Sequence, residues 1–132
     1  MVERIALNFV ELSLEVEVSI SGWQVIKPSV CQGASGVHHK FSLLAFDGER
    51  RRAFDIYPEV GEIEVLRTFV KSTDTGISAC IVCSRGRPTE RGLKLASEYG
   101  MKTLSPREIG PFFEEEVMKV RASSRTMLQR HS

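Results

Sequence analysis

The sequence predicts an α/β domain of three layers, in which a mixed central sheet is flanked by helices. Two stretches with strand composition, 39–46 and 51–57, are separated by Asp47-Gly48-Glu49, which is typical of a hairpin turn. The unbroken apolar run from Ala79 to Cys83 is typical of a strand covered on both faces. Because helical patterns separate this run from the neighbouring strands, the sheet is expected to be mixed, with helices on its faces.

The length and composition are those of one globular domain. The chain has 132 residues, 42% of them hydrophobic, and 18 basic and 17 acidic side chains leave a formal net charge of +1. A chain of this length can bury roughly two thirds of its unfolded surface in one core. We expect one domain over residues 1–120 and a basic C-terminal tail over residues 121–132.

Composition also excludes some classes of protein. The near-neutral total charge excludes a protein that coats nucleic acid by charge alone. No run of about 20 apolar residues is present, and the N-terminus lacks the pattern of a signal peptide. These observations predict a cytoplasmic protein.

The first twenty residues carry two conflicting periodicities. Between Val2 and Val10 the apolar residues follow helical spacing, whereas from Val10 to Ile20 they alternate strictly with Glu or Ser. Strict alternation is typical of a strand. Periodicity alone therefore predicts a helix followed by a long strand, and Gly22 is placed to end either element.

Turn residues and apolar spacing divide the rest of the chain into strands and helices. The predicted strands are 23–26, 39–46, 51–57, 79–83 and 101–104. The predicted helices are 61–75, 89–99 and 106 to about 120, followed by a frayed end. Thr89 is a suitable N-terminal cap, and Gly76 and Gly100 are placed to end the first two of these helices.

Cys80 and Cys83 have a C-x-x-C spacing that is found in zinc and redox sites. On a predicted strand, positions three apart point to opposite faces, so these two thiols cannot chelate one ion. With Cys31 the chain has three cysteines, an odd number that indicates a reducing compartment. We expect buried, unreactive thiols.

Four segments of the chain resemble the restriction-endonuclease-like, or PD-(D/E)xK, superfamily. These segments are Gly33–Ala45, Phe54–Tyr57, Thr75–Val82 and Leu95–Leu104. The most similar branch contains the small archaeal and bacterial Mrr-like and RecB-nuclease-like domains. The resemblance covers roughly residues 1–105 and implies a restriction-endonuclease-like fold whose core opens with a helix. It therefore favours helix over strand through about Ser19.

The resemblance also implies a metal-dependent nuclease centre, most of which this sequence lacks. Active members place an Asp on the first hairpin strand and Asp/Glu-x-Lys on the second, where these groups hold Mg²⁺ and orient water. Here the same positions carry Ser42, and Asp55 followed by Tyr57, so only Asp55 matches. His39 matches the loop histidine of the family, but Lys40 stands where acids often flank it. One carboxylate is expected to hold Mg²⁺ poorly.

An active centre is the alternative interpretation. Lys71, on the following helix, can replace the missing lysine, and Asp47 or Glu49 can supply carboxylates if the hairpin pairs in another register. In that case Asp55 is a weak metal ligand, Mg²⁺ is the cofactor, and the chain is a DNA endonuclease of the Mrr-like or Holliday-resolvase-like kind. Otherwise Asp55 is a hydrogen-bonded buried acid and no cofactor is expected.

The total charge of +1 hides a polarity along the chain. Residues 1–22 carry a net charge of −3, whereas residues 84–107 and residues 117–132 each carry +4. Arg85 and Arg87 lie between a predicted strand and a helix whose first N–H groups favour anions. With basic residues of the hairpin they predict contacts to nucleic-acid phosphates. The predicted nucleic-acid-binding residues are Arg85, Arg87, Arg51, Arg52 and Lys40.

These features favour binding over catalysis. The expected function is a catalytically degenerate nuclease-like module that binds nucleic acid or a DNA-associated protein in a regulatory role. Because some similar archaeal proteins bind the TATA-binding protein, the resemblance implies a transcription factor of that kind as a protein partner. The alternatives are the DNA endonuclease and a protein-interaction domain without nucleic-acid contact, in which the acidic N-terminal segment forms a homodimer contact.

Overall fold

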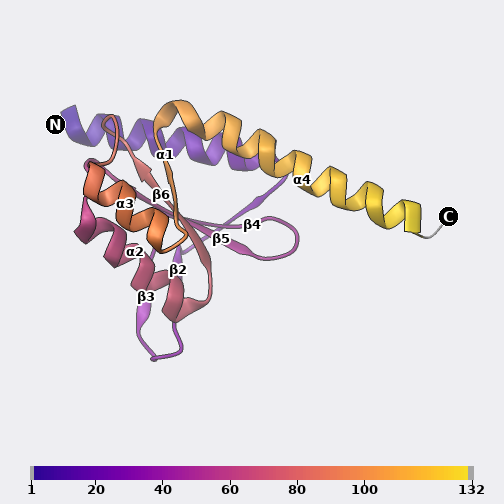
Figure 1. Cartoon of the computed structure of the whole chain (residues 1–132), viewed down its shortest axis with the longest axis horizontal. Coiled ribbons are helices and arrows are strands. Elements are labelled where there is room, and N and C mark those ends of the chain that lie inside the picture. Colours follow the sequence, from indigo (N-terminus) through magenta and orange to yellow (C-terminus); the bar gives the residue numbers. More distant parts are fainter. Residues whose placement is uncertain (1, 131–132) are drawn as a thin grey trace.

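A five-stranded mixed sheet forms the middle layer of the fold (Figure 1). The computed structural model describes the backbone of residues 2–130 and the side chains of residues 9–122. In spatial order the strands are β1 (Gln24–Ile26), β4 (Leu43–Phe46), β5 (Arg51–Tyr57), β6 (Ser78–Cys83) and β7 (Lys102–Leu104). The first three pair antiparallel, and β5, β6 and β7 pair in parallel. The predicted α/β class with a mixed sheet is confirmed.

Helices cover both faces of this sheet. They are α1 (Val2–Ile20), α2 (Glu62–Thr75), α3 (Glu90–Glu98) and α4 (Ile109–Arg130). One core cluster joins α1 and α4 to Phe54 and Ile56 of the central strand. Another joins α2 and α3 to Ile81 and Cys83 on the opposite face. Because side chains alternate along β5, Asp55 faces α2, away from Phe54 and Ile56.

The predicted strand over residues 10–20 is wrong, and the helix that the resemblance favours is confirmed. α1 is helical from Val2 to Ile20. Val10, Leu14 and Val18 are buried against the sheet, and the other members of the alternating series are exposed. The alternating residues therefore form two apolar stripes on different sides of one helix. Residues four positions apart lie on the same side, because a helix completes one turn in about 3.6 residues, whereas residues two positions apart lie on nearly opposite sides.

The predicted strand 39–46 is in fact two strands that belong to different sheets. β3 (His38–Lys40) pairs with β2 (Val30–Gln32) in a separate two-stranded ribbon, which the sequence patterns did not predict. The break comes at Phe41 and Ser42: the Phe41 N–H donates to the Ser29 carbonyl, and the Ser42 N–H donates to the Asp55 carboxylate. Strands of three residues are too short to show a reliable period of two.

The caps and cysteines agree with expectation. The Thr89 hydroxyl accepts a hydrogen bond from the Gly92 N–H at 3.0 Å, and Gly76 ends α2 with a φ of 71°. Cys80 and Cys83 are buried free thiols in the clusters on opposite faces of the sheet. Cys31 is also a buried free thiol.

The last helix is longer than predicted. After a 3₁₀ turn at Pro106–Glu108, α4 continues to Arg130 and does not end near residue 120. Residues 121–130 contain no Gly or Pro and several strong helix formers, which explains the extension. The C-terminal half of α4 projects beyond the other elements (Figure 1). Within the described residues, no helix has the length and apolar character needed to cross a membrane.

Candidate functional site

Asp55 is the centre of a compact polar cluster between β5 and α2. It is only 3% exposed, and its Oδ2 accepts hydrogen bonds from the Thr68 hydroxyl at 2.7 Å and the Tyr57 hydroxyl at 3.2 Å. Lys71 Nζ lies 2.5 Å from the same oxygen. Oδ1 accepts the Ser42 N–H at 3.2 Å. Four donors, one of them a cation, therefore satisfy and neutralise this buried carboxylate.

Lys71 is held on three sides. Besides the ion pair with Asp55, its ammonium donates to the Lys40 carbonyl at 2.8 Å. It also lies 4.8 Å from the centroid of the Phe41 ring, within the range of a cation–π contact. The structure thus brings Lys71 and Asp55 together, which is the geometry that the active interpretation required.

Ser42 and Tyr57, at the degenerate family positions, have structural contacts. The Ser42 hydroxyl accepts the Ile56 N–H at 2.9 Å, so Ser42 bridges the end of β4 to β5 through its backbone and side chain. Burial raises the pKa of Tyr57 to about 12, and the neighbouring Asp55 carboxylate adds to this shift. The Tyr57 phenol is therefore a neutral hydrogen-bond donor near neutral pH.

Asp47 and Glu49 lie at the other end of the hairpin from Asp55. The register of β4 and β5 pairs Phe46 with Arg51 and Leu43 with Phe54, which places the turn far from the cluster. Burial opposes ionisation of Asp47, but hydrogen bonds from the N–H groups of Arg50 and Glu49 outweigh it and lower its pKa.

The residues around Asp55 do not fit Mg²⁺. A hard cation needs several oxygen ligands, whereas the groups nearest to this carboxylate are an ammonium and three hydrogen-bond donors. Among the described side chains, no three His, Cys, Asp or Glu residues gather as ligands of a metal ion would. The chemistry of this donor set is that of a cross-link between β5 and α2.

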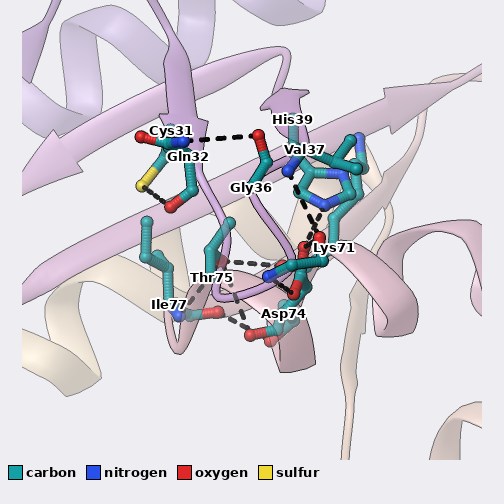
Figure 2. Close-up of polar contacts among 11 residues, drawn as sticks. Cys31, Gln32, Gly36, Val37, His39, Lys71, Asp74, Thr75 and Ile77 are labelled. Atoms are coloured by element: carbon teal, nitrogen blue, oxygen red, sulfur yellow. Dashed lines mark hydrogen bonds and ion pairs between the residues drawn. The ribbon is translucent and has the colours of Figure 1, made fainter.

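His39 belongs to a second polar cluster, at the end of α2 (Figure 2). His39 Nε2 lies 2.7 Å from Asp74 Oδ2. The same carboxylate accepts the Ser35 N–H at 3.0 Å and the Ser35 hydroxyl at 2.6 Å. Hydrogen bonds from Ser35, then from His39, lower the pKa of Asp74. This cluster fastens the β2–β3 ribbon to α2.

A shallow groove of about 480 Å³ lies beside the Asp55 cluster. Exposed apolar side chains of α2 form its floor, and basic or polar side chains surround them. Its lining residues are His39, Tyr57, Ile63, Leu66, Arg67, Val70 and Lys71. Arg67 was not predicted as a site residue, although it precedes Lys71 by four positions and so shares its side of the predicted helix.

A second hollow of about 620 Å³ lies at the carboxyl ends of β6 and β7. Arg87, from the loop after β6, and Arg107, from the turn after β7, both line it. Glu108 lies in the same hollow, where hydrogen bonds from Ser105 lower its pKa. Arg107 belongs to the segment 84–107, which has a net charge of +4. It was not predicted as a binding residue, because no motif or spacing in the sequence distinguishes it from other surface arginines.

The other predicted binding residues lie elsewhere. Arg51 and Arg52 are at the amino end of β5, which runs parallel to β6, whereas Arg85 and Arg87 follow the carboxyl end of β6. Arg52 is 6% exposed and forms ion pairs with Asp47 and Glu116. The predicted basic residues therefore do not form one continuous surface.

Arg51, Arg85 and Lys40 are exposed side chains. Arg51 donates to the sulfur of Cys31 at 3.1 Å, and Lys40 ends the short strand β3 of the ribbon. Each of these three cations is accessible to an anion from solvent. Unlike Arg87, none of them lines the hollow at the carboxyl edge of the sheet.

Comparison with known proteins gives no assignment. No family model, curated protein or solved structure matches the chain. The geometry offers a neutralised carboxylate at Asp55, an apolar groove with a basic rim on α2, and an arginine-lined hollow at the carboxyl edge of the sheet. Of these three, the hollow is lined by two arginines from different loops, and guanidinium groups are strong hydrogen-bond donors to anions.

Proposed function

We propose that this chain is a catalytically degenerate nuclease-like module that binds the phosphate backbone of nucleic acid in a regulatory role. The observation that carries the proposal is the position of Arg87 and Arg107, which come from different loops and line one hollow. A guanidinium can donate two parallel hydrogen bonds to a phosphate, so two of them around one hollow suit a phosphate group.

The surroundings of this hollow support the same ligand. The segment 84–107 has a net charge of +4, and α3 begins directly after the loop that carries Arg87. The first N–H groups of a helix favour negative charge. Glu108 reduces the positive charge, but its carboxylate is held by the Ser105 N–H and hydroxyl.

The proposal also specifies the fold: within the α/β class, we propose that it is restriction-endonuclease-like. The opening helix α1, the antiparallel hairpin β4–β5 and the parallel pair β5–β6 support it. Asp55 on the second hairpin strand is the residue expected from the family resemblance. A cytoplasmic location belongs to the same proposal, and the three unpaired cysteines support it.

Fluorescence anisotropy with labelled single-stranded and duplex DNA tests the binding. We expect affinity to fall steeply between low and physiological salt, because binding releases counterions from the phosphates. The pair of changes Arg87→Ala and Arg107→Ala should reduce the slope of log affinity against log salt by about 1 to 2. Arg91→Ala is the matched control: it removes an exposed arginine of α3 that pairs with Glu62 outside the hollow.

Two results would overturn this proposal. If the protein binds no DNA at low salt, the nucleic-acid interpretation is wrong, and the protein-interaction domain becomes the better one. If Arg91→Ala weakens binding as much as the paired change, the hollow has no special role. A pull-down with a TATA-binding-protein-like factor then tests the protein partner that the resemblance implies.

A DNA endonuclease is the second candidate, because Lys71 Nζ lies 2.5 Å from Asp55 Oδ2. Its test is incubation of supercoiled, linear and branched DNA with the protein and Mg²⁺ or Mn²⁺. We expect no cleavage, since hydrogen-bond donors and a cation occupy the carboxylate. Cleavage that Asp55→Asn abolishes would contradict the degenerate assignment.

A further inference from the structure

The hollow at the carboxyl ends of β6 and β7 contains a carboxylate beside its two arginines. Arg87 lies in the loop after β6, whereas Arg107 and Glu108 lie in the 3₁₀ turn after β7. All three residues are exposed, so a ligand can reach them from solvent. A hollow lined by both signs of charge differs from the uniformly basic groove that follows the backbone of a long strand.

The turn holds the Glu108 carboxylate in place. Its Oε1 accepts the Ser105 hydroxyl at 2.8 Å and the Ser105 N–H at 3.1 Å. These hydrogen bonds lower the pKa of Glu108, and the positive charges of Lys102 and Arg87 add smaller contributions in the same direction. Glu108 is therefore ionised near neutral pH, and its side chain cannot leave this position without losing both bonds to Ser105.

A fixed carboxylate limits how a nucleic-acid strand can occupy the hollow. Phosphates follow one another closely along a strand. A strand that runs through the hollow has phosphates on both sides of the one held by the arginines, and Glu108 repels those that pass it. A strand that ends in the hollow has further phosphates on one side only, and these can leave the hollow away from Glu108. The carboxylate thus disfavours the interior of a strand more than its end.

The donors and charges of the hollow also suit a terminal phosphate. A phosphate monoester has three unesterified oxygens and a charge of about −1.5 to −2 near pH 7, whereas a phosphate inside a strand has two such oxygens and one charge. Arg87 and Arg107 can each donate two parallel hydrogen bonds. Together with Lys102, and after subtraction of the Glu108 charge, they give this corner of the sheet a local charge of +2. That charge balances a dianion.

We propose that the hollow binds the terminal phosphate of a nucleic-acid strand, with the phosphate monoester between Arg87 and Arg107 and with Glu108 excluding the interior of the strand. This inference rests on the proposed function, because it specifies which part of the nucleic acid the hollow recognises. The shared chemistry is the monoester, which a strand can carry at either its 5′ or its 3′ end.

Fluorescence anisotropy with three single-stranded DNA oligonucleotides tests the inference. They share one sequence and an internal label, and carry a 5′-phosphate, a 3′-phosphate or no terminal phosphate. We expect one phosphorylated form to bind about tenfold more tightly than the unphosphorylated form. Arg87→Ala and Arg107→Ala should each remove this preference. Arg91→Ala, which removes an exposed arginine of α3 that pairs with Glu62, should keep it.

Glu108→Gln tests the exclusion. Its amide oxygen can still accept the bonds from Ser105, but the negative charge is lost. The affinity for the unphosphorylated oligonucleotide should therefore rise more than the affinity for the preferred phosphorylated one, so that the preference narrows. Glu98→Gln, at an exposed acid of α3 outside the hollow, is the matched control and should leave the preference unchanged.

The outcomes separate this inference from the proposed function. If all three oligonucleotides bind equally and Arg87→Ala with Arg107→Ala weakens all of them, the hollow binds backbone phosphates and the terminal-phosphate inference is wrong. If no oligonucleotide binds at low salt, both the proposed function and this inference are wrong. An equal gain in affinity for all three oligonucleotides in Glu108→Gln would contradict the role given to this carboxylate.

Discussion

Gly33 lies against Asp74 so closely that a Cβ atom at residue 33 would overlap the Asp74 carboxylate. The next two residues continue this contact: the Ala34 N–H donates to the Asp74 carbonyl at 2.8 Å, and the Ser35 N–H donates to the carboxylate at 3.0 Å. The loop of the ribbon thus lies against Asp74 in the last turn of α2 (Figure 2). Glycine is required here for space, not for a special backbone conformation.

Gly33→Ala should destabilise the protein by roughly 1 to 3 kcal/mol, because the new methyl group displaces the carboxylate that holds Ser35 and His39. Urea denaturation gives the change in the free energy of unfolding. The control is Gly110→Ala in α4, where the nearest atom of another element, in the Glu17 side chain, is 3.9 Å from the new Cβ. That change should be neutral or stabilising by up to about 1 kcal/mol. Equal effects of the two changes would argue against the close contact.

The Asp55–Lys71 pair should behave as a coupled unit. Asp55→Ala leaves the Lys71 ammonium without its partner, and Lys71→Met leaves a buried carboxylate with neutral donors only, so each should lower the free energy of unfolding by about 2 to 4 kcal/mol. The double variant should lose less than the sum, with a coupling energy of about 1 to 3 kcal/mol. Urea denaturation of the four proteins measures it, and strictly additive losses would contradict the ion pair.

Tyr57 should ionise at unusually high pH. Its pKa is raised to about 12, from an ordinary value of 10.0, first by burial and then by the Asp55 charge. Because the folded-state pKa is the higher one, the stabilisation from this group is complete below pH 10.0 and is lost as the pH rises toward about 12. Titration of the tyrosinate absorbance should show this late step, and Tyr57→Phe should remove it. A phenol that ionises at its ordinary pKa would mean that Tyr57 is solvated.

Arg52 should anchor α4 to the hairpin. Its guanidinium lies 3.4 Å from Asp47 and 3.2 Å from Glu116, and 5.1 Å from the Trp23 ring centroid. Arg52→Met should cost about 2 to 4 kcal/mol of stability, because it removes the buried cation that both acids share. Asp47 then keeps only the Arg50 and Glu49 N–H groups and the long contact with Arg50, and Glu116 keeps Lys119 at 3.6 Å. It should also change the fluorescence of Trp23, the single tryptophan. Arg51→Met, at the exposed neighbouring position, is the control and should change the melting temperature little.

Patterns within a few neighbouring residues predicted several helices and strands. The other elements depend on contacts between residues that are far apart in the sequence. The strand β5, the helix α2 and the cap at Thr89 carry their signals within a few residues of sequence. α1 could not be read from periodicity, because two apolar stripes on one helix produce the alternation of a strand. The ribbon strands β2 and β3 have three residues each, and their separation from β4 depends on contacts that Phe41 and Ser42 make with distant residues.

The candidate site was predictable in part. Helical position alone suggested that Lys71 could reach Asp55, and it does. The places of Asp47 and Glu49 depended on the hairpin register, which composition does not determine. The convergence of Arg87 with Arg107 depends on the parallel pairing of β6 and β7, which brings two loops to one edge. The sequence around Arg52 predicts an exposed cation. Its burial is favourable because Glu116, a residue far along the chain, forms an ion pair with it.

One turn of α2 connects the central sheet to the β2–β3 ribbon. Lys71 reaches β5 through Asp55, while Asp74, three residues later, holds the ribbon through Ser35 and His39. A rigid helix cannot move one of these residues without the other, so a shift of α2 would loosen both attachments in the same movement. Because Lys71 also donates to the Lys40 carbonyl of β3, the ribbon is attached to this turn at two points. A ligand that pulls Lys71 from Asp55 would therefore change the environment of the Ser35 amide, although Ser35 is hydrogen-bonded to Asp74 and not to Asp55.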